Sequence, residues 1–217
     1  MFEKIFPGLF AFISSNMGSN CFLLTDEKIV LVDSSASNNA SQIIASLKEQ
    51  GIAPEQINLI LHTHGHADHF GCDFLFKNAE IMMHKHDAER VNKNDAAFTC
   101  SAWLQGTKIP AISSFLTPNQ TIDLGKLKLQ VLHTPGHTHG SVCLLERNKK
   151  LLFSGDTLFN AGIGRTDLPT GNAADLLQSL KTLKTTPFNY LLPGHGEMLK
   201  DGQQSNIENA LKMLFPE

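Results

Sequence analysis

The chain has 217 residues, 41% of them hydrophobic, which is enough to bury a large core, and we expect a single domain over residues 1–217. Lys and Arg number 18 against 21 Asp and Glu, a formal net charge of −3, so the chain lacks the basic field that nucleic-acid binding requires. It has neither a secretion-signal pattern at its start nor an apolar run of about 20 residues, so export and membrane insertion are not expected and the expected location is cytoplasmic.

The first elements expected along the chain are three strands and a helix. Apolar residues at 10–13, 21–24 and 29–32 indicate an opening meander. Residues 40–47 place Ala, Ile, Ile and Leu at helical spacing, and Gly51 is placed to end that helix. We expect this helix to cover one face of a sheet.

The next expected strand, residues 57–61, leads into a heptad with three imidazoles and a carboxylate, Thr63-His64-Gly65-His66-Ala67-Asp68-His69. This pattern at the end of a buried strand indicates a metal site, since a surface histidine cluster lacks the fixed Asp and the preceding strand. Residues two apart share a face of extended chain, so His64 and His66 can close on one ion. Asp68 and His69 lie past the turn and point elsewhere, which suggests a second metal.

Several residues around the heptad have more than one interpretation. His62 and Asp33 are placed either to orient the ligand loops or to make ordinary structural hydrogen bonds. His84 and His86 follow the apolar residues 81–83, and we interpret both as structural.

The segment 92–118 has no clear period and carries Phe98 and Trp103 among polar residues. These two aromatic side chains either line a pocket or anchor a surface loop.

Three later strand ends each carry one further metal-ligand residue. The alternating strand 127–131 leads to His137 in a Pro-Gly turn, and the apolar pair at 151–152 precedes Asp156, whose two oxygens suit a bridge between cations. The apolar residues 190–192 lead through a tight turn to His195. Taken singly, each is also consistent with a loop histidine or a helix cap. Together with the heptad they favour a joint metal centre.

The remaining patterns indicate structure rather than chemistry. Asn148-Lys149 is placed as a hairpin turn between two strands, and apolar residues at 176, 180 and 183 and at 207–214 predict two more helices. The cysteines are widely separated, so we expect reduced, mostly buried thiols instead of disulfides: Cys21, Cys72, Cys100 and Cys143.

The chain resembles the metallo-β-lactamase superfamily of metallohydrolases over nearly its whole length. Five motifs carry the resemblance: Val32-Asp33-Ser34, the heptad 63–69, Thr134-Pro135-Gly136-His137-Thr138, Gly155-Asp156-Thr157 and Pro193-Gly194-His195-Gly196. It implies an α/β fold, a four-layer αβ/βα sandwich of two mixed β-sheets flanked by helices. It also implies two sets of metal ligands: His64, His66, His137 and Asp156 for one ion, and Asp68, His69, Asp156 and His195 for the other.

Such a site implies two divalent metal ions as cofactors, zinc first, with iron or manganese as alternatives. Two cations about 3.5 to 4 Å apart bring the pKa of a shared water towards neutrality, so that it can attack an acyl carbon. Asp68 is the candidate catalytic residue, as acceptor of a proton when the intermediate collapses.

Within the superfamily, residues 155–159 and 162–169 look most like the short glyoxalase II-like (hydroxyacylglutathione hydrolase-like) proteins. This resemblance implies a small-molecule thioester as substrate. Only one helix is expected beyond His195, where a full-length glyoxalase II has a helical extension that contacts glutathione, so glutathione specificity is left open. Arg165 either binds a carboxylate of the substrate or pairs with Asp167.

Residues 164–167 also resemble the persulfide dioxygenases of the same superfamily. That alternative implies a single iron held by the positions matching His64, His137 and Asp156. A promiscuous lactonase or β-lactam hydrolase, and a non-catalytic metal-binding protein, are the further alternatives.

Overall fold

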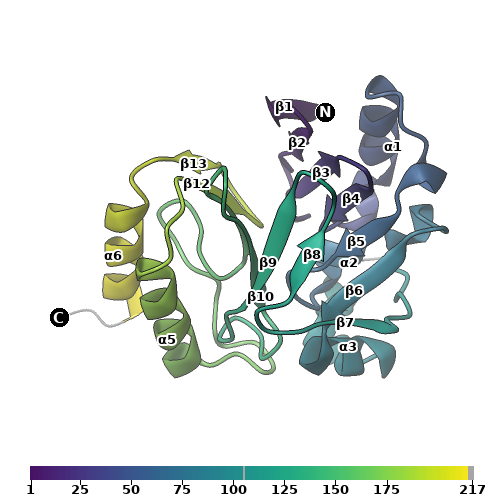
Figure 1. The fold of residues 1–217 in the computed structure, drawn as a ribbon. Coiled ribbons are helices and arrows are strands. Elements are labelled where there is room, and N and C mark those ends of the chain that lie inside the picture. The colour runs from purple at the N-terminus through teal and green to yellow at the C-terminus, as the bar shows by residue number, and fades with distance from the viewer. Residues whose placement is uncertain (105, 215–217) are drawn as a thin grey trace.

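The computed structural model describes residues 1–104 and 106–214. Residue 105 of the 92–118 segment and residues 215–217 of the expected domain lie outside the described residues. Two β-sheets stack face to face and helices cover their outer faces (Figure 1). Both sheets mix parallel and antiparallel pairs, so the predicted four-layer α/β sandwich is confirmed.

The first sheet has seven strands that follow one another in chain order. They are β1 (Phe2–Phe6), β2 (Leu9–Phe12), β3 (Cys21–Thr25), β4 (Ile29–Val32), β5 (Leu59–Leu61), β6 (Glu80–His84) and β7 (Ser114–Leu116). The pairs from β1 to β4 are antiparallel and those from β4 to β7 are parallel. The predicted meander is present, with β2 shifted by one residue from the expected 10–13.

The second sheet has six strands in the order β13-β12-β11-β10-β9-β8. They are β8 (Thr121–Asp123), β9 (Lys128–His133), β10 (Val142–Glu146), β11 (Leu151–Gly155), β12 (Tyr190–Pro193) and β13 (Leu199–Lys200). Only the β11–β12 pair is parallel. The predicted hairpin turn at Asn148-Lys149 is confirmed between β10 and β11.

The main core lies between the two sheets, because alternate residues of each strand point inward. In β5, Leu59 and Leu61 join the core shared by both sheets, whereas Ile60 faces the opposite side. There it meets Leu47 of helix α1 (Ala40–Glu49), which ends just before Gly51, a residue with φ of 70°. This strand is apolar on both faces because both are covered.

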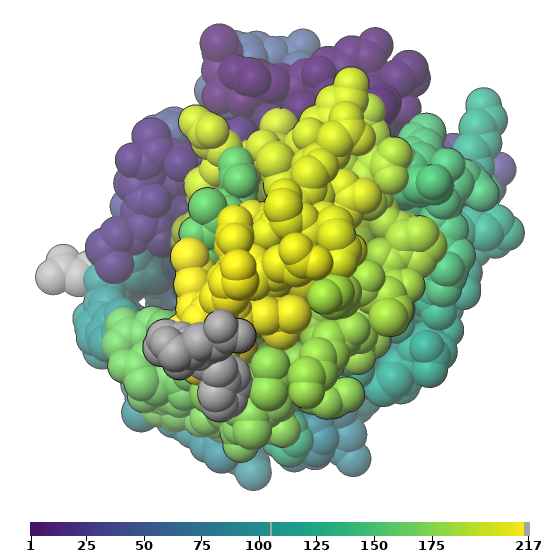
Figure 2. Space-filling view, turned by 90° about the vertical axis from the view of Figure 1, so that its left-hand side faces the viewer, coloured from purple at the N-terminus to yellow at the C-terminus, as the bar shows by residue number. Residues whose placement is uncertain are grey.

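The outer face of the second sheet is covered by α5 (Ala173–Lys184) and α6 (Gln203–Leu214). Figure 2 looks onto this side, with the yellow helix α6 near its centre. Three short helices lie near the first sheet: α2 (Ala67–Phe70), α3 (Lys85–Asn92) and α4 (Ala96–Thr99). Among the described residues, none of the helices has the length and apolarity that crossing a membrane requires.

All four cysteines, which lie in the described part of the chain, are buried and form no disulfide, as predicted. Single-turn 3₁₀ helices lie in the connections: Ser37–Asn39, Pro54–Gln56, Asp73–Leu75 and Ser101–Trp103.

Candidate metal centre

The strand directions bring the candidate ligands to one edge of the sandwich. Strands β4 and β5 are parallel, so the loops that follow them start at the same edge of the first sheet. Strands β9 and β11 are both antiparallel to β10, and β12 is parallel to β11, so the loops after these three strands share an edge of the second sheet. The carboxyl ends of strands are the usual place for ligands in open α/β sheets.

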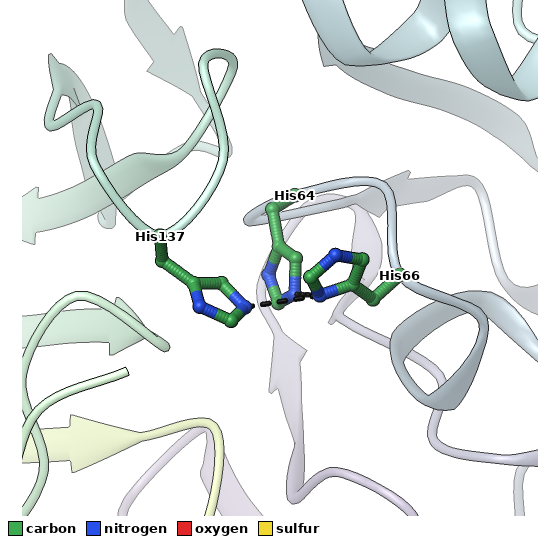
Figure 3. Close-up of side chains that lie close together, drawn as sticks. All are labelled: His64, His66 and His137. Atoms are coloured by element: carbon green, nitrogen blue, oxygen red, sulfur yellow. Dashed lines mark hydrogen bonds between the residues drawn. The ribbon is translucent and has the colours of Figure 1, made fainter. Parts of the chain in front are cut away.

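Three histidines from both sheets converge on one point, and we call them the histidine tripod: His64, His66 and His137. His64 Nε2 lies 3.1 Å from His66 Nδ1, and His137 Nε2 lies 3.0 Å from the same atom. Figure 3 shows the three rings turned toward one another, two from the loop after β5 and the third from the loop after β9. All three residues are buried.

The hydrogen bonds on the far side of the rings fix which tripod nitrogens carry lone pairs. The Thr63 hydroxyl donates its single proton to Asp33 Oδ2, so it accepts from His64 Nδ1, 3.2 Å away. His137 Nδ1 lies 2.7 Å from the carbonyl oxygen of Arg165 and must donate to it. In the neutral rings both Nε2 atoms therefore direct lone pairs toward His66, which is the donor arrangement of a metal site.

The protonation of His64 and His66 agrees with this arrangement. Burial, with help from His137, lowers the pKa of His66 to about 3. Burial and the neighbouring imidazoles of His69 and His137 also hold the pKa of His64 well below its ordinary value. Both rings are therefore neutral near pH 7, as metal ligation requires.

A second ligand set, formed by Asp68, His69 and His195, lies beside the tripod. Asp68 Oδ2 lies 3.1 Å from His195 Nε2 and 3.8 Å from His69 Nε2. His69 Nδ1 donates to Asp33 Oδ2 at 2.9 Å, which turns His69 Nε2 toward the site. Burial lowers the pKa of His69, but the surrounding carboxylates, Asp33 first, raise it well above its ordinary value. Asp68, His69 and His195 would hold a cation only with that proton released from His69.

Asp156 lies between the tripod and the second ligand set. Its Oδ1 is 3.3 Å from His69 Nε2, while its Oδ2 is 3.5 Å from His137 Nε2 and 3.7 Å from His195 Nε2. Burial raises the pKa of the Asp156 carboxyl, but His69 and His195 outweigh it and hold the pKa below the ordinary range. The ionised carboxylate lies between the two ligand sets, and its role as a bridge stays a prediction.

Unpaired polar atoms support the fit of these residues to metal ions. His66 Nε2, His69 Nε2 and Asp156 Oδ1 are buried and have no hydrogen-bond partner among the described residues. Leaving a buried polar atom without a partner costs about 1–3 kcal/mol. Cations coordinated at the centre would recover part of that cost for His69 and Asp156, whose unpaired atoms face each other.

Of the two roles that the sequence left open for Asp33 and His62, Asp33 contacts the ligand loop directly, and His62 pairs with Asp33. Asp33 Oδ1 accepts the backbone N–H of Thr63 at 2.9 Å, and Oδ2 accepts from His69. Burial raises the pKa of Asp33, but His69 and His62 lower it to about 2. This carboxylate therefore fixes both the direction of His69 and the start of the heptad.

The pH dependence of stability is expected to depend on His62. Its Nδ1 is 3.4 Å from Asp33 Oδ1 and its Nε2 is 2.8 Å from Asp73 Oδ2. Burial lowers the pKa of His62, but the two carboxylates, Asp73 first, raise it from 6.5 to about 9. The proton on His62 therefore makes its full contribution to the stability of the fold below pH 6.5. That contribution is lost as the pH rises through about 9.

We expect the Tm of the metal-free protein, followed by circular dichroism, to fall over this pH range more steeply than the Tm of a His62→Gln variant. Parallel Tm profiles for the two proteins would show that His62 is not the titrating group.

A pocket opens above the metal centre, and its walls are largely apolar. The lining residues outside the ligands are Met17, Cys100, Trp103, Leu104, Phe159, Gly164, Arg165 and Leu168. Of the two aromatic residues left open by the sequence, Trp103 lines this pocket with its side chain 59% exposed. Phe98 is fully buried and packs against the His66 ring at 5.7 Å between centroids, so it anchors the segment.

Arg165 pairs with Asp167 at the pocket rim, through Nε to Oδ1 at 2.7 Å and through Nη2 to Oδ2 at 2.6 Å. The sequence did not decide whether Arg165 pairs with Asp167 or binds the substrate. Both side chains are exposed, so a substrate carboxylate could compete with Asp167 for Arg165. The role of Arg165 in substrate binding stays a prediction.

The histidines outside the site form two stacked pairs. His84 stacks on His133 at 4.3 Å and His86 on His139 at 3.9 Å between ring centroids. The structural interpretation of His84 and His86 agrees with this packing.

Apart from Trp103, sequence reasoning did not identify the apolar lining of the pocket. Met17 and Leu168 come from irregular segments that carry no periodic signal, and only the three-dimensional arrangement brings them to the site.

Comparison with known proteins identifies one family for most of the chain. Residues 15–195 match a family model described as the metallo-beta-lactamase superfamily. Hydroxyacylglutathione hydrolase GloC of Haemophilus influenzae is 32% identical over 199 residues, covering 85% of this chain and 89% of GloC. The probable metallo-hydrolase YqgX of Bacillus subtilis is 32% identical over 200 residues, covering 88% and 92%. The crystal structure of TTHA1623 in a di-iron-bound form aligns with a TM-score of 0.75 at 29% identity, covering 91% and 98%.

Proposed function

The chain belongs to the metallo-beta-lactamase superfamily, and we propose that it is a metal-dependent hydrolase with two divalent cations. In this proposal the tripod and Asp156 hold one ion, and the second ligand set and Asp156 hold the other. The observation that carries it is the convergence of three imidazole nitrogens beside a second imidazole–carboxylate set, with one carboxylate between them. Imidazole and carboxylate donors suit zinc, and also iron or manganese.

The ions, when bound, would lower the pKa of a coordinated water and polarise a substrate carbonyl. Asp68 lines the pocket, with its side chain 23% exposed, and this position supports the proposal that it accepts a proton when the intermediate collapses. Trp103, Leu104 and Phe159 form apolar walls against which the acyl group would pack. Arg165 at the rim offers a cation for a substrate carboxylate.

We propose a thioester of the hydroxyacylglutathione type as the substrate. The similarity to GloC supports this choice, and so does the chemistry of the pocket. The described lining contains no lysine or tyrosine that could donate a proton to a basic leaving group. A thiolate is a weak base and leaves with little acid assistance, so a thioester fits such a site better than an amide.

The mononuclear iron dioxygenase remains the second candidate, because His64, His137 and Asp156 are gathered here as well. It gives no role, however, to the short contact between Asp68 and His195. The dinuclear hydrolase uses both ligand sets and is therefore preferred. A small-molecule partner without nucleic acid and a cytoplasmic location stay predictions.

The proposal is tested on protein purified without added metal. We expect about two metal ions per chain by elemental analysis, hydrolysis of S-D-lactoylglutathione, and no oxygen uptake with glutathione persulfide. One iron per chain with oxygen uptake would instead identify the dioxygenase. Metal-loaded protein that hydrolyses no thioester and takes up no oxygen would contradict both candidates.

A further inference from the structure

A buried carboxylate outside both ligand sets contacts the two loops that supply the histidine tripod. Asp87, in the first turn of α3, is only 1% exposed. Its Oδ2 accepts hydrogen bonds from the backbone N–H of Gly65 at 2.9 Å and from the Thr138 hydroxyl at 2.6 Å. Its Oδ1 accepts the backbone N–H of Gly140 at 2.7 Å. Gly65 separates the first two tripod histidines in the chain, and Thr138 directly follows the third.

These two loops follow strands of different sheets. The first follows β5 and the second follows β9, and these strands are not neighbours in either sheet. A single carboxylate that accepts donors from both loops therefore sets their separation directly. Asp87 does this on the first sheet's side of the tripod, because α3 begins where β6 ends.

The glycines at the two contact points show how tightly the loops press on this carboxylate. A Cβ on Gly65 would lie 3.1 Å from Asp87 Cβ and 2.8 Å from the Phe98 ring. A Cβ on Gly140 would overlap the carboxylate itself. Both positions need glycine because of this close approach rather than for a turn.

We propose that Asp87 is a positioning residue, which holds the two loops at the separation where the three tripod nitrogens converge on one cation. The proposal rests on the metal centre proposed above. It gives the tripod the kind of support that Asp33 gives to His69 in the second ligand set. Buried partners of ligand loops typically change metal affinity by 10- to 100-fold.

The carboxylate is required because all three of its partners are donors. An ionised Asp accepts at both oxygens and donates nothing. In an Asp87→Asn variant the side chain keeps its shape, but in either orientation its NH₂ group must face a backbone N–H, that of Gly65 or that of Gly140. At least one backbone donor then loses its acceptor, and the loops move apart.

The test is a zinc titration followed by the ring ¹⁵N signals of individual histidines, because these signals report which rings bind. For Asp87→Asn we expect the rings of the tripod to need about 10- to 100-fold more free zinc than in the wild type. The rings of His69 and His195 should respond within about threefold of the wild type. The amide proton signals of Gly65 and Gly140 should also shift in the metal-free variant.

Three further variants separate positioning from a general effect on the fold. Thr138→Val removes one of the three hydrogen bonds and should weaken zinc binding by the tripod about tenfold or less. Asp33→Asn should reverse the pattern and weaken His69 more than the tripod. Glu89→Gln alters an exposed carboxylate on the same helix that pairs with Lys85 at 3.7 Å, and should leave both sets unchanged.

Unchanged zinc affinity of the tripod in folded Asp87→Asn, or equal weakening of both ligand sets, would overturn the proposal. A crystal structure of the variant that keeps His66 Nδ1 and His137 Nε2 3.0 Å apart would do the same. Wild-type rings that take up no zinc would contradict the metal centre and this inference together. Zinc uptake as expected without thioester hydrolysis would contradict only the proposed substrate.

Discussion

The His66→Ala variant is expected to lose thioester hydrolysis and most of its bound metal. His66 Nδ1 is the atom on which the other two tripod nitrogens converge, at 3.1 and 3.0 Å, so its removal leaves no complete set of three imidazoles. Without the cation, a water molecule at the site keeps the high pKa of bulk water, and we expect kcat/KM to fall about a thousandfold or more. Steady-state kinetics with S-D-lactoylglutathione and metal analysis of the same sample measure both effects.

His86→Ala is the control for this variant. It also removes one imidazole, but the ring is exposed and stacks on His139 outside the metal centre. We expect it to keep wild-type metal content and activity. A His66→Ala protein that hydrolyses the thioester with no metal bound would show the dinuclear mechanism to be wrong.

The Asp68→Asn variant should show the second largest loss of activity, after His66→Ala. The amide keeps the size of the carboxylate but cannot accept a proton as a base, and it weakens the contact with His195. Losing a general base costs about a hundred- to ten-thousandfold in rate, so we expect kcat to fall within that range. Metal content separates the two roles of Asp68, because loss of the base alone leaves both ions bound, whereas loss of a ligand releases the second ion.

Asp175→Asn is the matched control, since Asp68 and Asp175 both lie in the first turn of a helix. Asp175 is exposed and lies outside the metal centre. If the Asp68→Asn variant kept both its metal content and the wild-type kcat, Asp68 would not be the proton acceptor.

The parts of the fold that could be predicted from the sequence are those whose pattern is local. Strands β5, β11 and β12 are apolar over most of their length because both of their faces are covered, and each runs into a histidine or aspartate. The helices α1 and α5 could be predicted from apolar residues at helical spacing. Strands β7 and β8 have three residues each and too few alternations to be recognised.

The candidate site also has residues that could be predicted from the sequence and residues that could not. Its ligand residues belong to short motifs, so the sequence alone was enough to propose them. Phe98 and Trp103 could not be told apart, because both are aromatic residues in one aperiodic polar segment, and only packing against His66 separates the anchor from the pocket wall. Asp87 carries no local signal either, since its partners lie 22 to 53 residues away in the sequence.

The spread of the ligand residues along the chain, from His64 after β5 to His195 after β12, bears on how the protein is made. Synthesis delivers the heptad of the first sheet well before the last histidine. A growing polypeptide that exposes only the heptad offers part of each ligand set: the first set is complete only with Asp156 after β11, and the second only with His195 after β12. The capacity to bind both ions, and with it hydrolysis, would therefore arise late, when the C-terminal half of the sandwich closes on the N-terminal half.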